Sequence, residues 1–201
     1  MAQGVLLIVC GPSGVGKTSL CDNLLKRRPR LTLSVSYTTR ERRGEEEDGV
    51  DYHFVDEDQF QAMREAGEFA ESAEVHGNWY GTSMSVIEAA WQRGRDLLFD
   101  IDYQGARQLK ERVPTANAVL IAPPDLITLE ERLHGRATDS DEVIEERLSA
   151  ARHELAQYEL FDHIVENDDF DRAAGVLDSI YVATRHERHI QARWLDEILQ
   201  Q

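Results

Sequence analysis

The chain has 201 residues, of which 22 are Lys or Arg and 38 are Asp or Glu, so its formal net charge is −16. Such a charge repels phosphate backbones, which excludes broad binding of nucleic acid or of an anionic membrane through overall charge. The length and the hydrophobic content of 41% suit one globular α/β unit with small inserted lobes, in which any anionic ligand must be met by a local cluster of positive groups.

The N-terminal residues and the cysteines indicate the cellular location of the protein. No apolar run approaches the length of a membrane span, and the chain enters a strand-like run without a basic leader and a cleavage site. Cys10 and Cys21 have no metal-like spacing and are expected to be reduced core thiols. We therefore expect a soluble, cytoplasmic protein, monomeric or homo-oligomeric, that binds neither nucleic acid nor membrane.

Apolar periodicity predicts strands and helices that alternate along the chain. Strands are expected at residues 5–10, 31–38, 51–55, 69–76, 79–82, 96–102, 116–122 and 163–166. Helices are expected at residues 18–28, 56–66, 83–93, 103–112, 125–135, 141–158 and from 169 onward. This alternation predicts an α/β fold with a parallel sheet flanked by helices, and ligands beyond the carboxyl ends of its strands. Residues 31–82, rich in short strands, are a candidate inserted lobe.

The stretch GPSGVGKT follows a predicted strand and opens a predicted helix, which is the context of a phosphate-binding loop. Its glycines let successive N–H groups point at phosphate oxygens, and the helix N-terminus adds the positive end of its dipole. Lys17 is expected to reach the β- and γ-phosphates of a nucleoside triphosphate, and the Thr18 hydroxyl to ligate Mg²⁺. The loop residues predicted to bind ATP are Gly11, Pro12, Ser13, Gly14, Val15, Gly16, Lys17 and Thr18.

The predicted strand DLLFDID ends in Asp100 and Asp102. Residue alternation turns both carboxylates to one face, where either could serve the magnesium ion through water, together with Thr18. A strand end that only meets solvent would carry the same residues. The guanine-reading N/T-K-x-D element of a switch GTPase is missing from the sequence.

A second cluster of positive charge lies in TTRERRGEEEDGVDYHF, residues 38–54. Arg40 and Arg43 are three residues apart, just past a predicted strand, and Tyr52 and Tyr80 bracket the same lobe. Guanidinium forks hold phosphate oxygens bidentately, and tyrosine hydroxyls can donate to the remaining lone pairs. A second phosphate site would make the protein a transferase with a phosphorylated acceptor, whereas a solvated basic turn suffices for Arg42 alone.

In order and spacing these motifs resemble the guanylate kinase family of P-loop nucleoside monophosphate kinases. The similarity runs through GPSGVGKT, SVSYTTR, GVDYHFV, FAESAEVHGNWYGT, LLFDIDYQGA, IAPPDLITLEERLHGRATDS, RLSAARHEL and IVENDD. The resemblance implies transfer of the γ-phosphate of ATP to GMP, and to dGMP as well, with Mg²⁺ as cofactor, in purine nucleotide metabolism. It also implies a core of residues 1–33, 84–125 and 159–201, a mixed-strand GMP-binding lobe of residues 34–83 and a helical lid of residues 126–158.

The resemblance further assigns roles to single positions. The family's ligands of the acceptor phosphate match Arg40, Arg43, Tyr52 and Tyr80. Its guanine-reading groups match Ser36, Glu71, Thr82 and Asp100. The chemistry agrees, because a carboxylate can accept from guanine N1–H and N2–H₂ together but would be left unpaired opposite adenine N1. Thr82 could instead cap the helix that follows it.

Arginines of the predicted lid complete the expected site. Arg132 and Arg136 are four residues apart and would share a helix face, and Arg147 lies on the next predicted helix. Arg132 and Arg136 are expected on the ATP side, and Arg136 and Arg147 match family arginines that contact ATP phosphates. In an open state they would instead pair with glutamates of their own helices. Asn167 matches a turn beside the adenine, although a polar loop after a strand would look the same. The predicted catalytic residues are Lys17, Arg40, Arg43, Arg136 and Arg147.

Four positions depart from the family pattern, and none of them removes an expected ligand. Arg42 replaces a common proline, Glu45 a glycine, Ser72 a tryptophan and Ala137 a lid glycine. Two other functions stay open at this point. A non-catalytic interaction module of the same fold typically has an eroded phosphate loop, and a kinase for a phosphorylated sugar should lack the guanine-reading set.

Overall fold

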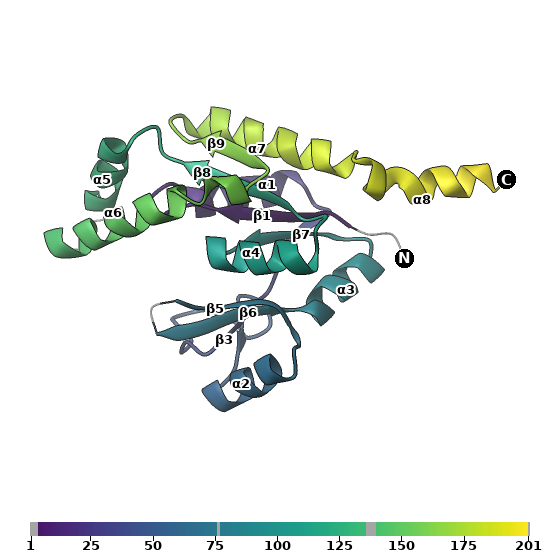
Figure 1. Cartoon of the computed structure of the whole chain (residues 1–201), viewed down its shortest axis with the longest axis horizontal. Helices are drawn as coiled ribbons and strands as arrows, with labels where there is room; N and C mark the ends of the chain where they lie inside the picture. Colours follow the sequence, from purple (N-terminus) through teal and green to yellow (C-terminus); the bar gives the residue numbers. More distant parts are fainter. Residues whose placement is uncertain (1–3, 76, 136–139, 201) are drawn as a thin grey trace.

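The larger sheet of the protein is parallel and carries helices on both faces (Figure 1). The computed structural model describes residues 4–75, 77–135 and 140–200. The strand order is β2-β7-β1-β8-β9, and every neighbouring pair is parallel. These strands are β1 Leu6–Cys10, β2 Leu31–Leu33, β7 Asp96–Asp100, β8 Asn117–Ala122 and β9 His163–Glu166. The arrangement confirms the predicted fold class.

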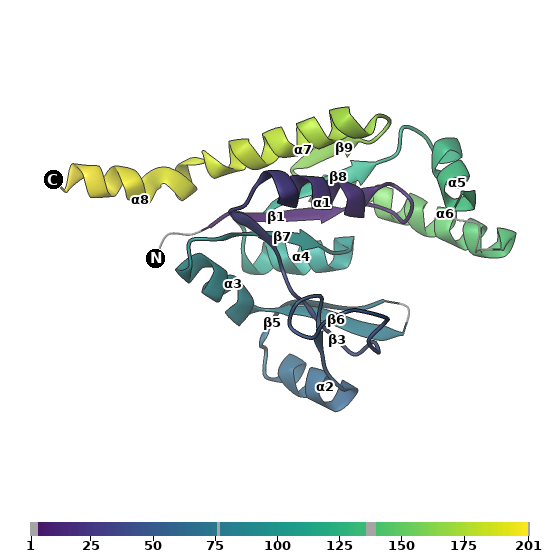
Figure 2. The same cartoon turned by 180° about the vertical axis from the view of Figure 1, so that it is seen from behind.

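Strand β1 is buried on both faces, as its continuous apolar run predicts. Leu7 and Val9 belong to a core cluster with α1 (Lys17–Arg27) and α7 (Phe170–Arg185). Leu6 and Ile8 belong to a second cluster with α3 (Met84–Gln92) and α4 (Tyr103–Arg112). Figures 1 and 2 show these two helical layers from opposite sides of the sheet. The two cysteines are buried and unpaired, as expected.

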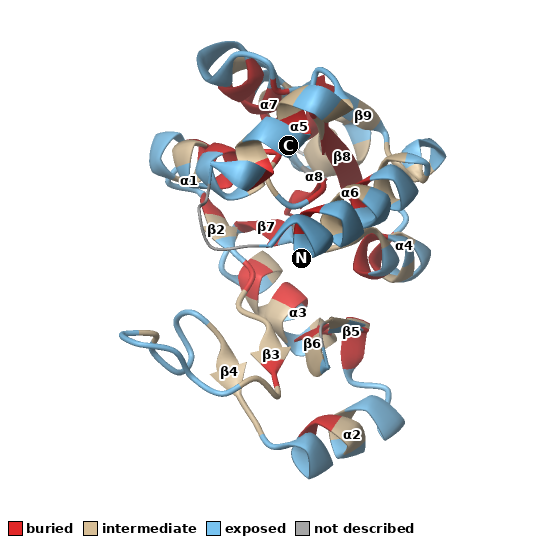
Figure 3. Cartoon of the chain, turned by 90° about the vertical axis from the view of Figure 1, so that its left-hand side faces the viewer, coloured by how far each residue is buried: buried red, intermediate tan, exposed pale blue. Residues whose placement is uncertain are grey.

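A smaller sheet with strand order β4-β3-β6-β5 lies beside the first. Its strands are β3 Tyr37–Thr38, β4 His53–Phe54, β5 Phe69–Val75 and β6 Asn78–Ser83. Helix α2 (Glu57–Glu65) covers it and begins with the predicted capping box of Asp56 and Gln59. Phe60 of this helix stacks on Phe69 of β5, with ring centroids 4.5 Å apart. The connection between β3 and β4 is exposed over nearly its whole length (Figure 3).

Two predicted strands are wrong in extent. Residues 31–38 form two strands in different sheets, because β2 pairs with β7 of the large sheet while β3 pairs with β4 and β6 of the small one. The alternating pattern continues through both pieces, so the sequence does not mark the crossing. The strand predicted at residues 96–102 ends at Asp100, and Asp102 is the N-cap residue of α4.

The remaining helices are α5 (Leu126–His134), α6 (Asp141–Leu155) and α8 (Arg188–Leu199). α5 and α6 bury a small core of their own, which includes Leu133 and Ile144. A single 3₁₀ turn at Tyr158–Leu160 follows α6, so this helix is shorter than predicted. α8 extends beyond the sheet, as both views show. Among the described residues, every helix is too short or too polar to span a bilayer.

Candidate active site

The glycine-rich loop connects β1 to α1 and encloses a cavity of about 290 Å³. Gly14 and Gly16 have φ angles of 86° and 92°, a region that side chains with a Cβ rarely adopt. Space is also short at both positions. A Cβ at Gly14 would lie 2.9 Å from Leu133 of α5, and one at Gly16 would lie 2.6 Å from the side-chain nitrogen of Asn167. Glycine is therefore required at both positions, for backbone conformation and for packing.

Asn167 braces this loop from the end of β9. Its buried side chain donates a hydrogen bond from Nδ2 to the carbonyl oxygen of Val15, at 2.7 Å. Arg132 of α5 donates from Nη2 to the carbonyl oxygen of Asn167, at 2.9 Å. The sequence predicted Asn167 and Arg132 beside ATP. It did not predict that their hydrogen bonds connect α5, the end of β9 and the glycine-rich loop.

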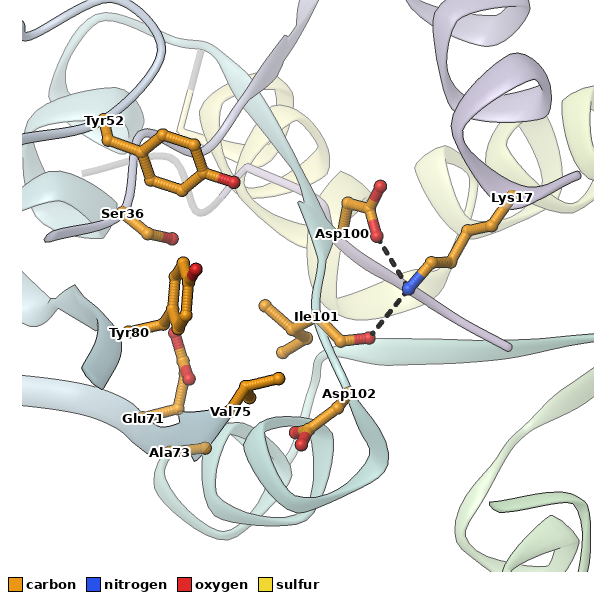
Figure 4. Close-up of a pocket in the computed structure, with 10 residues that line it drawn as sticks. All are labelled: Lys17, Ser36, Tyr52, Glu71, Ala73, Val75, Tyr80, Asp100, Ile101 and Asp102. Atoms are coloured by element: carbon orange, nitrogen blue, oxygen red, sulfur yellow. Dashed lines mark hydrogen bonds and ion pairs between the residues drawn. The ribbon is translucent and has the colours of Figure 1, made fainter. Parts of the chain in front are cut away.

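Lys17, the first residue of α1, points at the carboxyl end of β7 (Figure 4). Its Nζ lies 2.8 Å from Oδ1 of Asp100 and donates to the carbonyl oxygen of Ile101, at 3.5 Å. β1 and β7 are neighbours with Val9 opposite Asp100, so the sheet itself brings the loop and this carboxylate together. Burial acts to lower the pKa of Lys17, but Asp100, together with Cys10 and Glu154, outweighs burial and raises the pKa above its usual value.

The two carboxylates of the β7 end have different surroundings. Asp102 accepts from the backbone N–H of Gly105 at 2.8 Å and from Nε2 of Gln104 at 3.3 Å. Asp100 and Asp102 are not strand neighbours as predicted, because β7 ends at Asp100 and Asp102 caps α4, although both side chains line the cavity between the two sheets. Asp100 and Thr18 also line a second cavity, of about 310 Å³. Mg²⁺ prefers oxygen ligands such as hydroxyl and carboxylate groups, so the side chains of Thr18 and Asp100 suit that ion.

A cavity of about 290 Å³ connects the two sheets. Lys17, Asp100 and Asp102 lie on its core side, and Figure 4 shows the other polar side chains across from them. Those on the small sheet and its approach are Ser36, Tyr52, Glu71 and Tyr80. The cavity therefore joins the predicted ligands of a triphosphate to those of an acceptor.

Glu71 is a buried carboxylate, only 4% exposed, in the wall of this cavity. It stands opposite Thr82 on β6 and accepts a hydrogen bond from the Thr82 side chain. The Thr82 hydroxyl also lies 3.0 Å from that of Ser36, so it serves this cluster, and Ser83 takes the N-cap position of α3. In the described part of the chain, no Lys or Arg forms an ion pair with Glu71. Burial, aided by Asp102, raises the pKa of Glu71 to about 7 despite the bonds from Thr82.

Glu46 organises the arginines of the exposed connection between β3 and β4. Its carboxylate accepts from Nη2 of Arg40 and from the backbone N–H of Arg43, both at 2.8 Å. The Arg40 guanidinium also lies 5.3 Å from the ring centroid of Tyr52, whose ring packs edge-on against Tyr80. The hydrogen bond from Arg40 lowers the pKa of Glu46. The Arg43 side chain is exposed, and no hydrogen bond or ion pair holds it within the described residues.

The predicted lid arginines are only partly described. Arg147 lies half-buried on α6. Arg136 and Ala137 lie outside the described residues, and α5 ends at His134. The sequence did not predict that α4 contacts β5 beside Glu71.

Comparison with known proteins gives one consistent family. The guanylate kinase family model matches residues 3–184. A guanylate kinase of Alkalilimnicola ehrlichii is 47% identical over 98% of this chain and 97% of its own, and one of Thiobacillus denitrificans is 51% identical over 96% and 92%. The crystal structure of guanylate kinase from Anaplasma phagocytophilum matches with a TM-score of 0.76 at 30% identity, covering 96% of this chain and 94% of that one.

The burial of Glu71 should be visible in the dependence of stability on pH. Because its pKa is about 7 in the folded chain and 4.5 as the ordinary value, Glu71 costs stability as pH rises from 4.5 through 7. Glu71→Gln removes the ionisable group. The difference in unfolding free energy between this mutant and wild type should therefore be about 2–3 kcal/mol more favourable to the mutant at pH 8 than at pH 5. Urea unfolding at the two pH values measures this difference.

The exposed Glu74 on the same strand provides the matched control. Glu74→Gln should leave the free energy of unfolding near the wild-type value at both pH values. An equal effect of Glu71→Gln at pH 5 and pH 8 would show that Glu71 titrates normally and is not held in a desolvated site.

Proposed function

Because the chain belongs to the guanylate kinase family, it transfers the γ-phosphate of ATP to GMP, and we propose that the cavities described above hold these two nucleotides. ATP occupies the glycine-rich loop, with Arg132 and Asn167 on its nucleoside side. GMP occupies the lobe of residues 34–83, and residues 126–158 act as the lid. The two unpaired thiols favour a reducing, cytoplasmic setting.

One observation carries this assignment. A continuous cavity has Lys17 of the phosphate loop at one end and the buried Glu71 at the other. In-line transfer requires donor and acceptor phosphates in contact with one another, between their two binding sites. A module that only binds proteins has no need of a desolvated carboxylate facing a lysine-lined cavity. The intact lysine and threonine of the loop support the same conclusion.

The GMP phosphate is proposed to bind between Arg40, Arg43, Tyr52 and Tyr80. Glu46 holds Arg40 in place before the ligand arrives, so less side-chain entropy is lost on binding. The exposed Arg43 is available to close on the phosphate from the other side. Tyrosine hydroxyls supply uncharged donors, which suit the oxygens that the guanidinium groups leave unpaired.

The guanine base is proposed to bind against Glu71, with Ser36, Thr82 and Asp100 around it. The ionised carboxylate of Glu71 presents two acceptors, which match the adjacent N1–H and N2–H₂ donors of guanine. Adenine presents an acceptor at N1 and would leave a buried carboxylate oxygen without a donor. A site built to satisfy polar groups in this way rejects the wrong base by orders of magnitude.

The magnesium ion is proposed to bind at Thr18, with Asp100 on the other side of the cavity that the two share. When bound, the ion neutralises charge on the phosphate oxygens of the donor. Asp102 is the weaker candidate, because its carboxylate oxygens are already engaged by Gly105 and Gln104. Asp100, which already pairs with Lys17, would be the carboxylate available to the ion.

In the transfer step, an oxygen of the GMP phosphate forms a bond to the γ-phosphorus of ATP while the bond to the β–γ bridging oxygen breaks. The products are GDP and ADP, and no proton has to move. The protein's task is to align two anions and reduce their repulsion, which Lys17, Arg40 and Arg43 perform. Arg136 and Arg147 of the lid are proposed to join them on closure, which also excludes water.

A coupled assay of ADP release tests the substrate assignment. With ATP and Mg²⁺ present, GMP and dGMP should be phosphorylated, whereas AMP, UMP and ribose 5-phosphate should react at least about 10³-fold more slowly in kcat/KM. No turnover with any acceptor would favour a binding module. A sugar phosphate as the best acceptor would overturn the guanine site.

Removing the proposed phosphate ligands should reduce turnover without loss of the fold. Lys17→Ala is expected to lower kcat by about 10²–10³, because it deletes a charge that acts on the transferring group. Arg43→Ala should cut kcat/KM for GMP by a similar factor. Steady-state kinetics measure both effects, and circular dichroism checks the fold.

The neighbouring Arg42 offers a control within the same exposed connection, because its side chain donates, among the described residues, to nothing but the backbone oxygen of Glu46. Arg42→Ala should change kcat/KM for GMP by less than about threefold. Near-normal turnover of Lys17→Ala or Arg43→Ala would contradict the proposed roles of these residues.

A further inference from the structure

Helix α4 lies between the two sheets (Figure 1). Ala106 and Leu109 of this helix are fully buried in the core cluster against the large sheet. Gly105 and Gln108, three residues apart, contact β5 of the small sheet instead. One helix therefore packs on the core with one face and reaches the wall of the GMP cavity with another.

Gln108 binds the backbone of β5 directly beside Glu71. Its Oε1 accepts from the N–H of Ser72 at 3.1 Å, and its Nε2 donates to the carbonyl oxygen of Ser72 at 2.8 Å. β5 is the edge strand of its sheet, so these two backbone groups face away from β6. The primary amide supplies one acceptor and one donor, as a further strand would. It thereby fixes the backbone one residue after Glu71.

Gly105 allows the helix to approach the Glu71 carboxylate. A Cβ at this position would lie 2.9 Å from Oε2 of Glu71 and 3.3 Å from Cδ1 of Ile101. Glycine inside a helix is less favourable than alanine. The backbone here has an ordinary negative φ, so conformation does not require glycine and the close approach does. Gly175 in α7 shows the contrast, because nothing lies within 4 Å of the Cβ that it lacks.

We propose that Gly105 and Gln108 are positioning residues that place the Glu71 carboxylate for guanine and thereby set the selectivity for GMP over AMP. The proposal rests on the proposed function of Glu71. Two carboxylate oxygens can meet N1–H and N2–H₂ together only if the carboxylate lies at the correct depth and rotation. Gln108 fixes the strand that carries Glu71, and Gly105 leaves room for Oε2. Neither residue needs to touch the nucleotide.

Gly105→Ala tests the space requirement, with Gly175→Ala as the matched control. The added methyl group should displace the Glu71 carboxylate and raise KM for GMP by about tenfold or more, with KM for ATP within twofold of wild type. The ratio of kcat/KM for GMP to that for AMP should fall by a similar factor. Gly175→Ala should leave both KM values and the ratio unchanged. An unchanged KM for GMP and an unchanged ratio in folded Gly105→Ala would overturn the role of Gly105.

Gln108→Leu removes the two hydrogen bonds from the Gln108 amide to the backbone of Ser72. It tests the proposal independently if Gly105→Ala does not fold. It should raise KM for GMP about threefold to tenfold and reduce the GMP-to-AMP ratio, again without changing KM for ATP. Gln92 at the end of α3 is exposed, and its side chain forms no hydrogen bond within the described residues, so Gln92→Leu is its control. Equal increases in both KM values, or no change in either, would overturn the proposal.

The guanine site and the role of α4 can be tested separately. If wild-type enzyme does not prefer GMP, the guanine site itself is wrong. If wild type prefers GMP while Gly105→Ala and Gln108→Leu keep the wild-type KM values and ratio, the guanine site stands and only the role of α4 is wrong.

Discussion

The buried carboxylate of Glu71 is the constraint on which the arrangement of the proposed GMP-binding lobe depends. A desolvated carboxylate without a cationic partner is unfavourable, and its pKa of about 7 reflects that cost. The surroundings that hold it are Thr82 on the adjacent strand and the first turn of α4. In the proposed complex, the N1–H and N2–H₂ groups of guanine would donate to this carboxylate in addition to Thr82. The lobe would then be less stable without ligand in exchange for selectivity in the complex.

The residues proposed to bind phosphate differ from Glu71, because two of their cationic side chains, Lys17 and Arg40, already have an anionic partner. Lys17 contacts Asp100 and Arg40 contacts Glu46, so these groups are oriented before any nucleotide binds. In a chain with a formal charge of −16, local pairing of this kind keeps two positive groups at the cavity. The sheet contributes as well, since the register of β1 and β7 brings the glycine-rich loop and Asp100 to the same edge. Fold and charge together suit the proposed binding of two anions at this edge.

The sequence was sufficient for the features that depend on local pattern. The phosphate loop, the order of strands and helices and the capping box at Asp56 follow from periodicity and residue type. Features that depend on contacts between distant segments were missed, such as the division of residues 31–38 between two sheets and the use of Asp102 as a helix cap. The bonds of Asn167 and Gln108 to backbone groups leave no pattern at all in one sequence. A glycine inside the helical pattern at position 105 was a signal that could have been used.

The central claim is that a carboxylate titrating near neutral pH reads the guanine base, and proton release on GMP binding tests it most directly. Calorimetry at pH 7 in buffers of different ionisation enthalpy measures the number of protons released. With a pKa of about 7, Glu71 should lose about half a proton on binding GMP, whereas the phosphate of GMP accounts for only about a tenth, since its second pKa is about 6. Release of about half a proton or more would support the account. Release of a tenth or less, or proton uptake, would contradict it.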